Sequence, residues 1–233
     1  MAIAITEHGD THDEGHDGGA AHEGGHHETP EQRDRKERLA LWIFIAGDAL
    51  FLLLELFTWF YLRALNTNGM WRGAACTTAS PCSDGLNNPL THEVAKASPW
   101  YTLVIAVLVV VGALVIRAVE RAAVKRDSRS VMGGIAGVAL LALLAAIVLQ
   151  CLQFGDLPFT TIDGTYASAF EFFMGSTLFH VTLLAGITFG MWNRIRLGRY
   201  DEGRWYRVRL IRMFAVWIAA SVCVLALVMS LFA

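Results

Sequence analysis

The stretch Trp42-Ile-Phe-Ile-Ala-Gly-Asp48-Ala-Leu-Phe-Leu-Leu-Leu-Glu55-Leu-Phe-Thr-Trp59 decides the fold, because it is almost wholly apolar yet carries two carboxylates. A charged side chain at the centre of a bilayer costs about 2.5–3.5 kcal/mol on insertion scales, so such residues usually face the interior of a helix bundle. Asp48 and Glu55 are separated by about two helical turns and therefore share one helix face. The stretch predicts a membrane helix with a polar stripe turned toward other helices.

The composition of the whole chain agrees with a membrane protein. Of 233 residues, 55% are hydrophobic and 17% are charged, and the mean hydropathy is +0.44. An ordinary soluble domain has about 25% charged residues. The apolar residues fall into five blocks, each close to or above the roughly 18–20 residues that span a bilayer. These blocks are 39–62, 99–117, 131–153, 167–192 and 211–232, and they predict an all-α bundle of five transmembrane helices.

The positions of Lys and Arg predict the orientation of these helices, because cytoplasmic loops close to spans are enriched in both. Four lie just before the first block, five between the second and third, and seven between the fourth and fifth, so 16 of the 19 basic residues share one side. Only Arg63, Arg72 and Lys96 fall on the other side. We expect a multi-pass membrane protein with the N-terminus inside and the C-terminus outside.

The chain divides into two unequal parts. Residues 1–36 are rich in Gly, His, Asp and Glu with little to bury, which predicts a disordered cytoplasmic tail, and residues 37–233 form the membrane domain. The histidines of the tail are compatible with weak metal binding, but their spacing does not resemble a structural zinc site, and a solvated tail is the simpler interpretation. The net charge of −2 and the lack of a basic aromatic patch give no reason to expect a nucleic-acid partner.

The four cysteines separate by location. Cys151 and Cys223 lie within predicted spans, where Cys behaves as a small hydrophobe. Cys76 and Cys82 share the loop that the orientation places outside, and an oxidising exterior permits a disulfide between them. Two free thiols are the alternative.

His180 lies near the middle of the fourth predicted span, and Asp48 lies at a similar depth in the first. A carboxylate and an imidazole at matched depth could pair, which would reduce the cost of burying both. The alternative is that His180 is a hydrogen-bonded packing residue. We take Asp48, Glu55 and His180 as candidate proton-related residues.

Redox cofactors have few candidate ligands in this sequence. Copper and haem need converging imidazoles, thiolates or thioethers, and the predicted spans contain a single histidine. We therefore expect no catalytic residue, no metal site and no redox centre in this chain itself.

Several motifs resemble subunit III of the haem–copper cytochrome oxidases. Pro158-Phe-Thr-Thr-Ile-Asp163-Gly164-Thr-Tyr166 is similar to the family loop Pro-Phe-Thr-(two residues)-Asp-Gly-(one residue)-Tyr. Phe44-Ile-Ala-Gly-Asp48-Ala-Leu-Phe51-Leu resembles the family's Phe-(two residues)-Ser-Glu-(two residues)-Phe-Phe. Gly175-Ser-Thr177-Leu-Phe-His180-Val181 resembles Gly-Phe-His-Gly-Leu-His-Val. The resemblance covers roughly 38–65 and 140–217, and five spans resemble the short bacterial forms. The resemblance therefore implies a location in a bacterial plasma (inner) membrane.

The resemblance implies a role and a set of partners. Asp48 stands where the family has a buried glutamate, and His180 stands at its second histidine. The implied role is a non-catalytic subunit of a respiratory, proton-translocating terminal oxidase of the cytochrome c oxidase type, packed on the haem-bearing subunit I together with subunit II. There it would stabilise subunit I, bind phospholipid and support proton uptake, while haem and copper reside in the partner subunits.

Departures from the family pattern keep other functions open. Thr177 replaces the first family histidine, Gln153 stands where a glutamate is usual, and the last-helix motif survives mainly as Val216-Trp217. The alternatives are an accessory subunit of a nitric oxide reductase and a stand-alone proton-coupled transporter. Separately, the arginine-rich segment 194–212 suits phosphate, so Arg204 and Arg207 are candidate contacts for anionic lipid headgroups, with a generic positive-inside loop as the alternative.

Overall fold

The computed structural model describes residues 29–65, 71, 95–200 and 205–232. It is all-helical over this part of the chain, with five long helices and one short 3-10 helix, η2. Their bounds are α1 Pro30–Leu65, α2 Pro99–Val124, α3 Arg129–Gly155, η2 Thr161–Asp163, α4 Thr165–Arg196 and α5 Tyr206–Leu231. Each long helix is long and apolar enough to cross a membrane, which confirms the predicted fold class.

Some predictions concern residues outside the described part of the chain. These are the disorder of residues 1–28, the Cys76–Cys82 disulfide and the lipid contact of Arg204. The predicted disordered tail extends too far along the chain. Residues 30–36, which the prediction assigned to it, form the first turns of α1.

A helix-capping motif explains this early start of α1. The side chain of Gln32 accepts a hydrogen bond from the Thr29 amide (3.2 Å), and the Thr29 hydroxyl accepts one from the Gln32 amide (3.4 Å). This reciprocal pattern is a capping box, and proline is favoured at the first helical position because it lacks an amide hydrogen to satisfy. One turn later Arg33 pairs with Glu37 (3.3 Å). The sequence Thr29-Pro-Glu-Gln32 carries this signal, so the boundary could have been predicted.

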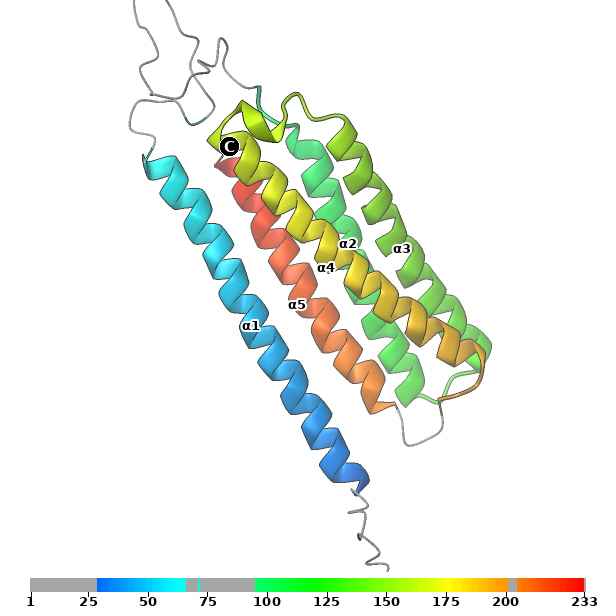
Figure 1. Ribbon diagram of the computed structural model, residues 1–233. Coiled ribbons are helices and arrows are strands. Elements are labelled where there is room, and N and C mark those ends of the chain that lie inside the picture. The colour runs from blue at the N-terminus through cyan, green and yellow to red at the C-terminus, as the bar shows by residue number, and fades with distance from the viewer. Residues whose placement is uncertain (1–28, 66–70, 72–94, 201–204, 233) are drawn as a thin grey trace, which may run out of the picture.

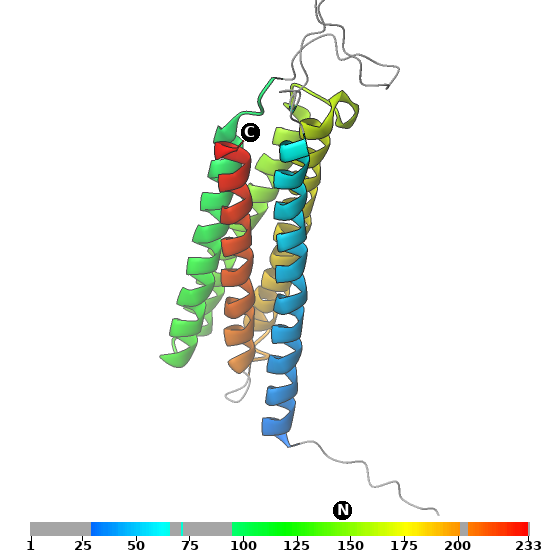
Figure 2. The same ribbon diagram turned by 90° about the vertical axis from the view of Figure 1, so that its left-hand side faces the viewer.

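Helices α2, α3, α4 and α5 form a four-helix bundle in which each helix packs on its chain neighbour and α5 closes the ring on α2. Helix α1 lies outside this ring, beside α4 and α5 (Figures 1 and 2). Most large side chains of α1, such as Ile43, Leu50 and Phe57, are exposed. An apolar surface of this kind faces lipid or a partner protein rather than water.

Small residues set the spacing of α2 and α3. A Cβ atom built on Gly112 would lie 3.0 Å from Cδ2 of Leu143, closer than ordinary van der Waals contact. Ala136, Ala139 and Ala146 of α3 are fully buried. Close approach of backbones through small residues is a common way for membrane helices to associate, because lipid leaves no hydrophobic driving force between them.

Residues of the Pro158–Tyr166 motif fix the conformation of the loop between α3 and α4. The carboxylate of Asp163 accepts hydrogen bonds from the amide (2.6 Å) and hydroxyl (3.0 Å) of Thr160, closing η2. Gly164 has a φ of 130°, which side chains rarely tolerate. Phe159 packs edge-on against Tyr166 with centroids 5.4 Å apart. The tyrosine hydroxyl accepts a hydrogen bond from the Ala97 amide (3.3 Å). The motif therefore fixes a tight return into α4.

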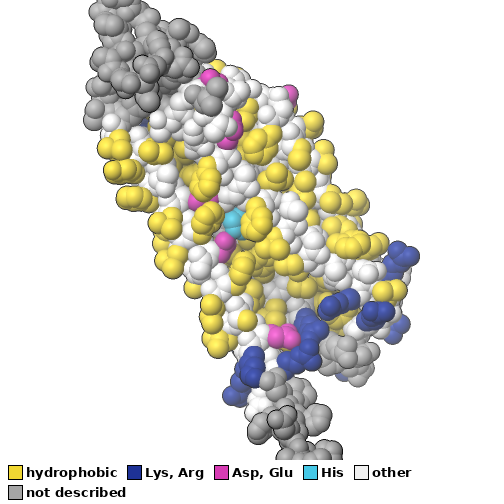
Figure 3. Space-filling view, viewed as in Figure 1, with side chains coloured by type: hydrophobic (Ala, Val, Ile, Leu, Met, Phe, Trp, Pro, Cys, Tyr) yellow, Lys and Arg dark blue, Asp and Glu magenta, His cyan; other side chains and the backbone are white. Residues whose placement is uncertain are grey.

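Basic side chains gather at the end of the bundle where α1 begins, as Figure 3 shows. The end of α2, the start of α3, the end of α4 and the start of α5 also lie at this end (Figure 1). We call it the basic end.

Candidate functional site

Three helices contribute polar side chains to one buried site. Asp48 of α1 accepts a hydrogen bond from the indole nitrogen of Trp217 on α5 (2.5 Å to Oδ2). Its other oxygen, Oδ1, lies 2.7 Å from Nε2 of His180 on α4. The pairing predicted from matched depth is therefore present, and we call these three residues the Asp48 site.

The surroundings of the Asp48 site are apolar. The side chains of Asp48 and His180 are only 11% and 10% exposed. The rings of Phe51 and Phe179 lie 6.3 Å and 5.6 Å from the imidazole ring. Figure 3 shows the histidine near mid-height, flanked by acidic side chains among hydrophobic ones. In such low-dielectric surroundings an unpaired charge is costly, so the partners of each group determine what the site can do.

Hydrogen bonding fixes where the imidazole carries its protons. Nδ1 of His180 lies 2.7 Å from the backbone carbonyl of Ser176, one turn earlier in α4. A carbonyl only accepts, so Nδ1 carries a hydrogen. On the opposite side, Nε2 and Oδ1 of Asp48 share one proton: either the imidazolium donates to the carboxylate, or the carboxyl donates to the neutral imidazole. The site can thus transfer a proton between two helices with little movement of heavy atoms.

Glu55 lies close to this site on the same helix, as its spacing from Asp48 predicted. It is 2% exposed, its carboxyl interacts with the Ser176 side chain, and it is within electrostatic reach of both His180 and Asp48. One of its oxygens, Oε1, has no hydrogen-bond partner within the described part of the chain. By contrast, both carboxylate oxygens of Asp48 have hydrogen-bond partners. The two acids therefore differ in how well their burial is compensated.

Arg207, a predicted lipid contact, forms an ion pair with an acidic residue of α1. Its Nη2 lies 3.1 Å from Oε1 of Glu37, and the Tyr206 hydroxyl donates to Oε2 of the same carboxylate. These residues lie before the apolar blocks 39–62 and 211–232, at the basic end. Desolvation acts to raise the pKa of Glu37, but the hydrogen bonds and charge of its partners outweigh it and the pKa is lowered. Burial and the bond to Glu37 raise the pKa of Tyr206 to about 12.

Sequence reasoning missed three of these partners, and each left a recognisable signal. Ser176 precedes His180 by one helical turn, the spacing at which side chains meet a neighbouring turn. Trp217 was noted only as a remnant of a family motif. Glu37 follows Arg33 by four residues, a spacing that favours ion pairs on a helix.

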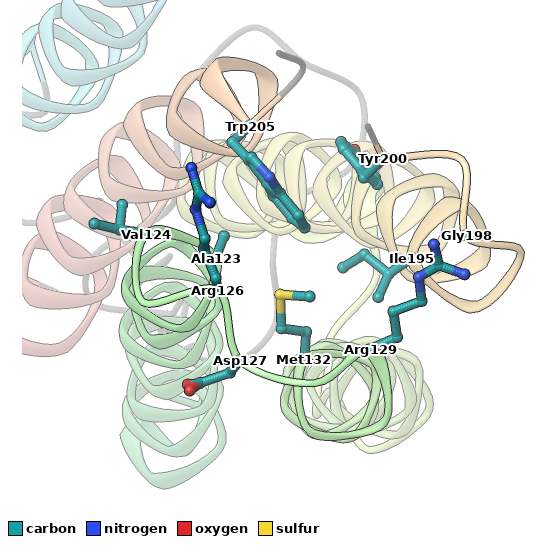
Figure 4. Close-up of a pocket in the computed structure, with 10 residues that line it drawn as sticks. All are labelled: Ala123, Val124, Arg126, Asp127, Arg129, Met132, Ile195, Gly198, Tyr200 and Trp205. Carbon is teal, nitrogen blue, oxygen red and sulfur yellow. The ribbon is translucent and has the colours of Figure 1, made fainter. Parts of the chain in front are cut away.

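A pocket with a volume of about 400 Å³ lies at the basic end (Figure 4). Tyr200 and Trp205 are stacked there, with ring centroids 5.4 Å apart and an interplanar angle of 14°. Figure 4 shows Met132 between α3 and Trp205, and the Arg129 guanidinium beside Gly198. A Cβ on Gly198 would lie 2.5 Å from that guanidinium, and its φ of 67° also favours glycine. These contacts cap the bundle and bring no acids or imidazoles together.

Within the described residues, no three His, Cys, Asp or Glu side chains gather closely enough to hold a metal ion. Thr177, which stands in place of a family histidine, is buried, and its hydroxyl has no partner there.

Comparison with known proteins does not place the chain in a family: no protein-family model matches it, and no curated protein is detectably similar in sequence. The fold and the site define a multi-pass membrane protein with a buried aspartate–histidine pair.

Proposed function

We propose that this chain is a non-catalytic, subunit III-like component of a respiratory haem–copper terminal oxidase in a bacterial inner membrane. The observation that carries the proposal is the Asp48–His180 pair, whose Oδ1 and Nε2 atoms lie 2.7 Å apart. By the resemblance, these two residues correspond to the family's buried acid and second histidine. The Pro158–Tyr166 motif supports it, because Phe159, Thr160, Asp163 and Tyr166 make contacts that fix the loop between α3 and α4, and Gly164 has a positive φ.

In this role the chain supplies no redox centre. Haem and copper belong to the partner subunits I and II. The Asp48 site contributes a group that holds a proton inside the membrane and releases it to a neighbouring uptake path. The exposed apolar face of α1 offers a surface for packing on a partner or on phospholipid.

Co-purification tests this proposal directly. The full chain, tagged at its C-terminus and extracted in mild detergent, should bring down a larger haem-containing chain, recognised by its visible absorption spectrum. Haem types and metal content separate a cytochrome oxidase from the related nitric oxide reductase. Recovery of the chain alone, without haem, from membranes that respire through haem–copper enzymes would contradict the proposal.

One observation favours a second function, a stand-alone proton-coupled transporter. The acids Asp48 and Glu55 lie on one buried stripe, and intramembrane acids often mark proton-coupled sites. The purified chain in sealed vesicles with an internal pH dye would then move protons without haem. An oxidase subunit would not do so on its own.

A further inference from the structure

A smaller pocket at the basic end, which we call the arginine pocket, has a volume of about 210 Å³. It is lined by Arg194, Arg199, Tyr200 and Arg207. Among the described residues that line it, none is acidic and none has an aliphatic side chain. The arginine pocket is therefore polar and positively charged, unlike the groove between α1, α4 and α5, whose lining is wholly apolar.

The end of α4 brings two of these arginines together. Gly198, with a φ of 67°, donates its amide hydrogen to the Ile195 carbonyl (3.0 Å). The Arg199 amide donates to the Arg194 carbonyl (3.0 Å). These two bonds form a Schellman motif, in which an apolar contact frequently joins the residues at the places of Arg194 and Arg199. Here two like charges replace that apolar contact, an arrangement that a bound anion would stabilise.

Tyr200 and the first turn of α5 complete the arginine pocket. The Tyr200 hydroxyl is within electrostatic reach of Arg194 and Arg207, so guanidiniums from the end of α4 and the start of α5 lie near it. Burial raises the pKa of Tyr200, and the two arginines offset this only in part. The hydroxyl therefore stays protonated at neutral pH and can donate a hydrogen bond. Trp205 gives α5 no side-chain cap, so the positive end of the helix dipole adds to the charge beside Arg207.

Glu37 offsets part of the positive charge, because its Oε1 lies 3.1 Å from Nη2 of Arg207. A guanidinium has five N–H donors, so this ion pair leaves donors on Arg207 for a second acceptor. Three guanidiniums against one carboxylate leave a net positive charge. Guanidinium binds phosphate in a bidentate geometry, so phosphate is the class of anion that this arrangement suits best.

We propose that the arginine pocket binds a soluble phosphate anion, held by the guanidiniums of Arg194, Arg199 and Arg207 and by the Tyr200 hydroxyl. The lining offers no aliphatic surface for an acyl chain, which favours a water-soluble anion over a lipid headgroup. The alternative is that these arginines only mark the loop side of the membrane and stabilise the carbonyl end of α4. The inference does not depend on an oxidase partner.

The test measures the binding of inorganic phosphate to the full chain in phosphatidylcholine nanodiscs, by titration calorimetry at constant ionic strength. Wild type should show one saturable site with a Kd of about 1 mM or tighter, as expected for three charge-assisted contacts. Arg194→Gln/Arg199→Gln should weaken phosphate binding by at least about tenfold. The matched control Arg196→Gln/Arg209→Gln removes the same charge at equally exposed positions that do not line the pocket, and should change the Kd less than about threefold.

Two further measurements separate a specific site from mere charge density. Tyr200→Phe keeps the net charge and the stacking on Trp205 but removes the hydroxyl, so it should weaken phosphate binding by about fivefold, whereas a generic basic loop would bind unchanged. In phosphatidylglycerol nanodiscs the ratio of Kd between Arg194→Gln/Arg199→Gln and wild type should persist, because the surface potential acts on both proteins. A lipid headgroup in the pocket would reduce that ratio to one.

Four outcomes would overturn the proposal. They are no saturable phosphate binding by wild type, equal losses in the two arginine pairs, unchanged binding in Tyr200→Phe, and loss of the ratio in phosphatidylglycerol.

Discussion

Nε2 of His180 lies 2.7 Å from Oδ1 of Asp48, and the other ring nitrogen of His180 lies 2.7 Å from a backbone carbonyl. The two contacts together leave one proton to be shared between α1 and α4. Trp217 holds the second carboxylate oxygen, so the carboxylate cannot rotate without losing a hydrogen bond. The pair is therefore oriented for proton exchange along one line.

The first prediction concerns the tautomer of His180. Because Nδ1 faces an acceptor, it should carry a hydrogen at every pH at which the chain is folded. Nitrogen NMR of histidine-labelled protein should show a protonated Nδ1, and the signal is assigned by its loss in His180→Gln. In Asp48→Asn, whose amide can donate to Nε2, only the neutral form with hydrogen on Nδ1 should remain. A deprotonated Nδ1 in the folded protein would contradict the geometry.

A second prediction rests on the proposed function. Asn at position 48 can accept from Trp217 and donate to His180, so Asp48→Asn preserves both contacts but cannot exchange a proton. The oxidase complex should assemble normally, while its proton-coupled turnover should fall at high pH, where protons are scarce. Turnover measured across pH, divided by haem content, separates this from an assembly defect. Normal assembly with an unaltered pH profile would remove Asp48 from proton uptake.

Much of this architecture could be predicted from sequence, because membrane helices have a simple length and composition requirement. Four of the five predicted spans lie within one observed helix each, and the fifth, 211–232, extends one residue past the end of α5. The Asp48–His180 pair was also predictable, since two costly polar groups at one depth have few alternatives to pairing.

Other features depended on packing that no linear pattern specifies. The position of α1 outside the four-helix ring is set by which faces fit, and the periodicity of α1 alone does not give it. The ion pair of Arg207 was not predicted, because Glu37 is distant in the sequence and only folding brings it within 3.1 Å of Arg207. The helical start at Pro30 was missed for a different reason: composition outweighed a capping signal that was present.

The third prediction tests the close packing of α2 on α3. Gly112→Ala places a methyl group 3.0 Å from Cδ2 of Leu143, so this buried side chain must move by a few tenths of an ångström. Compared with Ala at an uncrowded helix position, stability should be lower by about 1 kcal/mol. Leu143→Val should reduce the added cost of Gly112→Ala, because it shortens the opposing side chain. Gly186→Ala, where nothing lies within 4 Å of the new methyl group, serves as the control. Detergent-induced unfolding gives all four values, and equal effects at positions 112 and 186 would contradict the packing argument.

The fourth prediction concerns pH and the basic end of α1. Since the pKa of Glu37 is lowered below its ordinary value of 4.5, its interactions stabilise the fold above that value and are lost as pH falls through the lower folded pKa. Glu37→Gln should speed amide hydrogen exchange in the first turns of α1 by up to about fivefold at neutral pH, as expected for a half-exposed ion pair. In acid, where the Glu37 carboxyl is protonated, the exchange rates of Glu37→Gln and wild type should become equal. Asp127→Asn, in the link between α2 and α3, is the control and should leave exchange in α1 unchanged.

The last prediction contrasts the two acids of the opening stretch. Asp48 has partners for both oxygens, so Asp48→Leu leaves His180 Nε2 and the Trp217 indole hydrogen buried without partners. Each lost partner costs about 1–3 kcal/mol, and the helices should come apart at lower denaturant. Glu55 is 2% exposed and keeps one oxygen without a partner, so it already bears an uncompensated burial cost. Replacing such a group by an apolar one of similar volume is often neutral or stabilising, and Glu55→Leu should therefore unfold at equal or higher denaturant than wild type. Unfolding in detergent, followed by tryptophan fluorescence, measures both variants under one condition. Destabilisation by Glu55→Leu as large as that by Asp48→Leu would show that the contact of Glu55 with Ser176 outweighs its burial cost, and would contradict the contrast between the two acids.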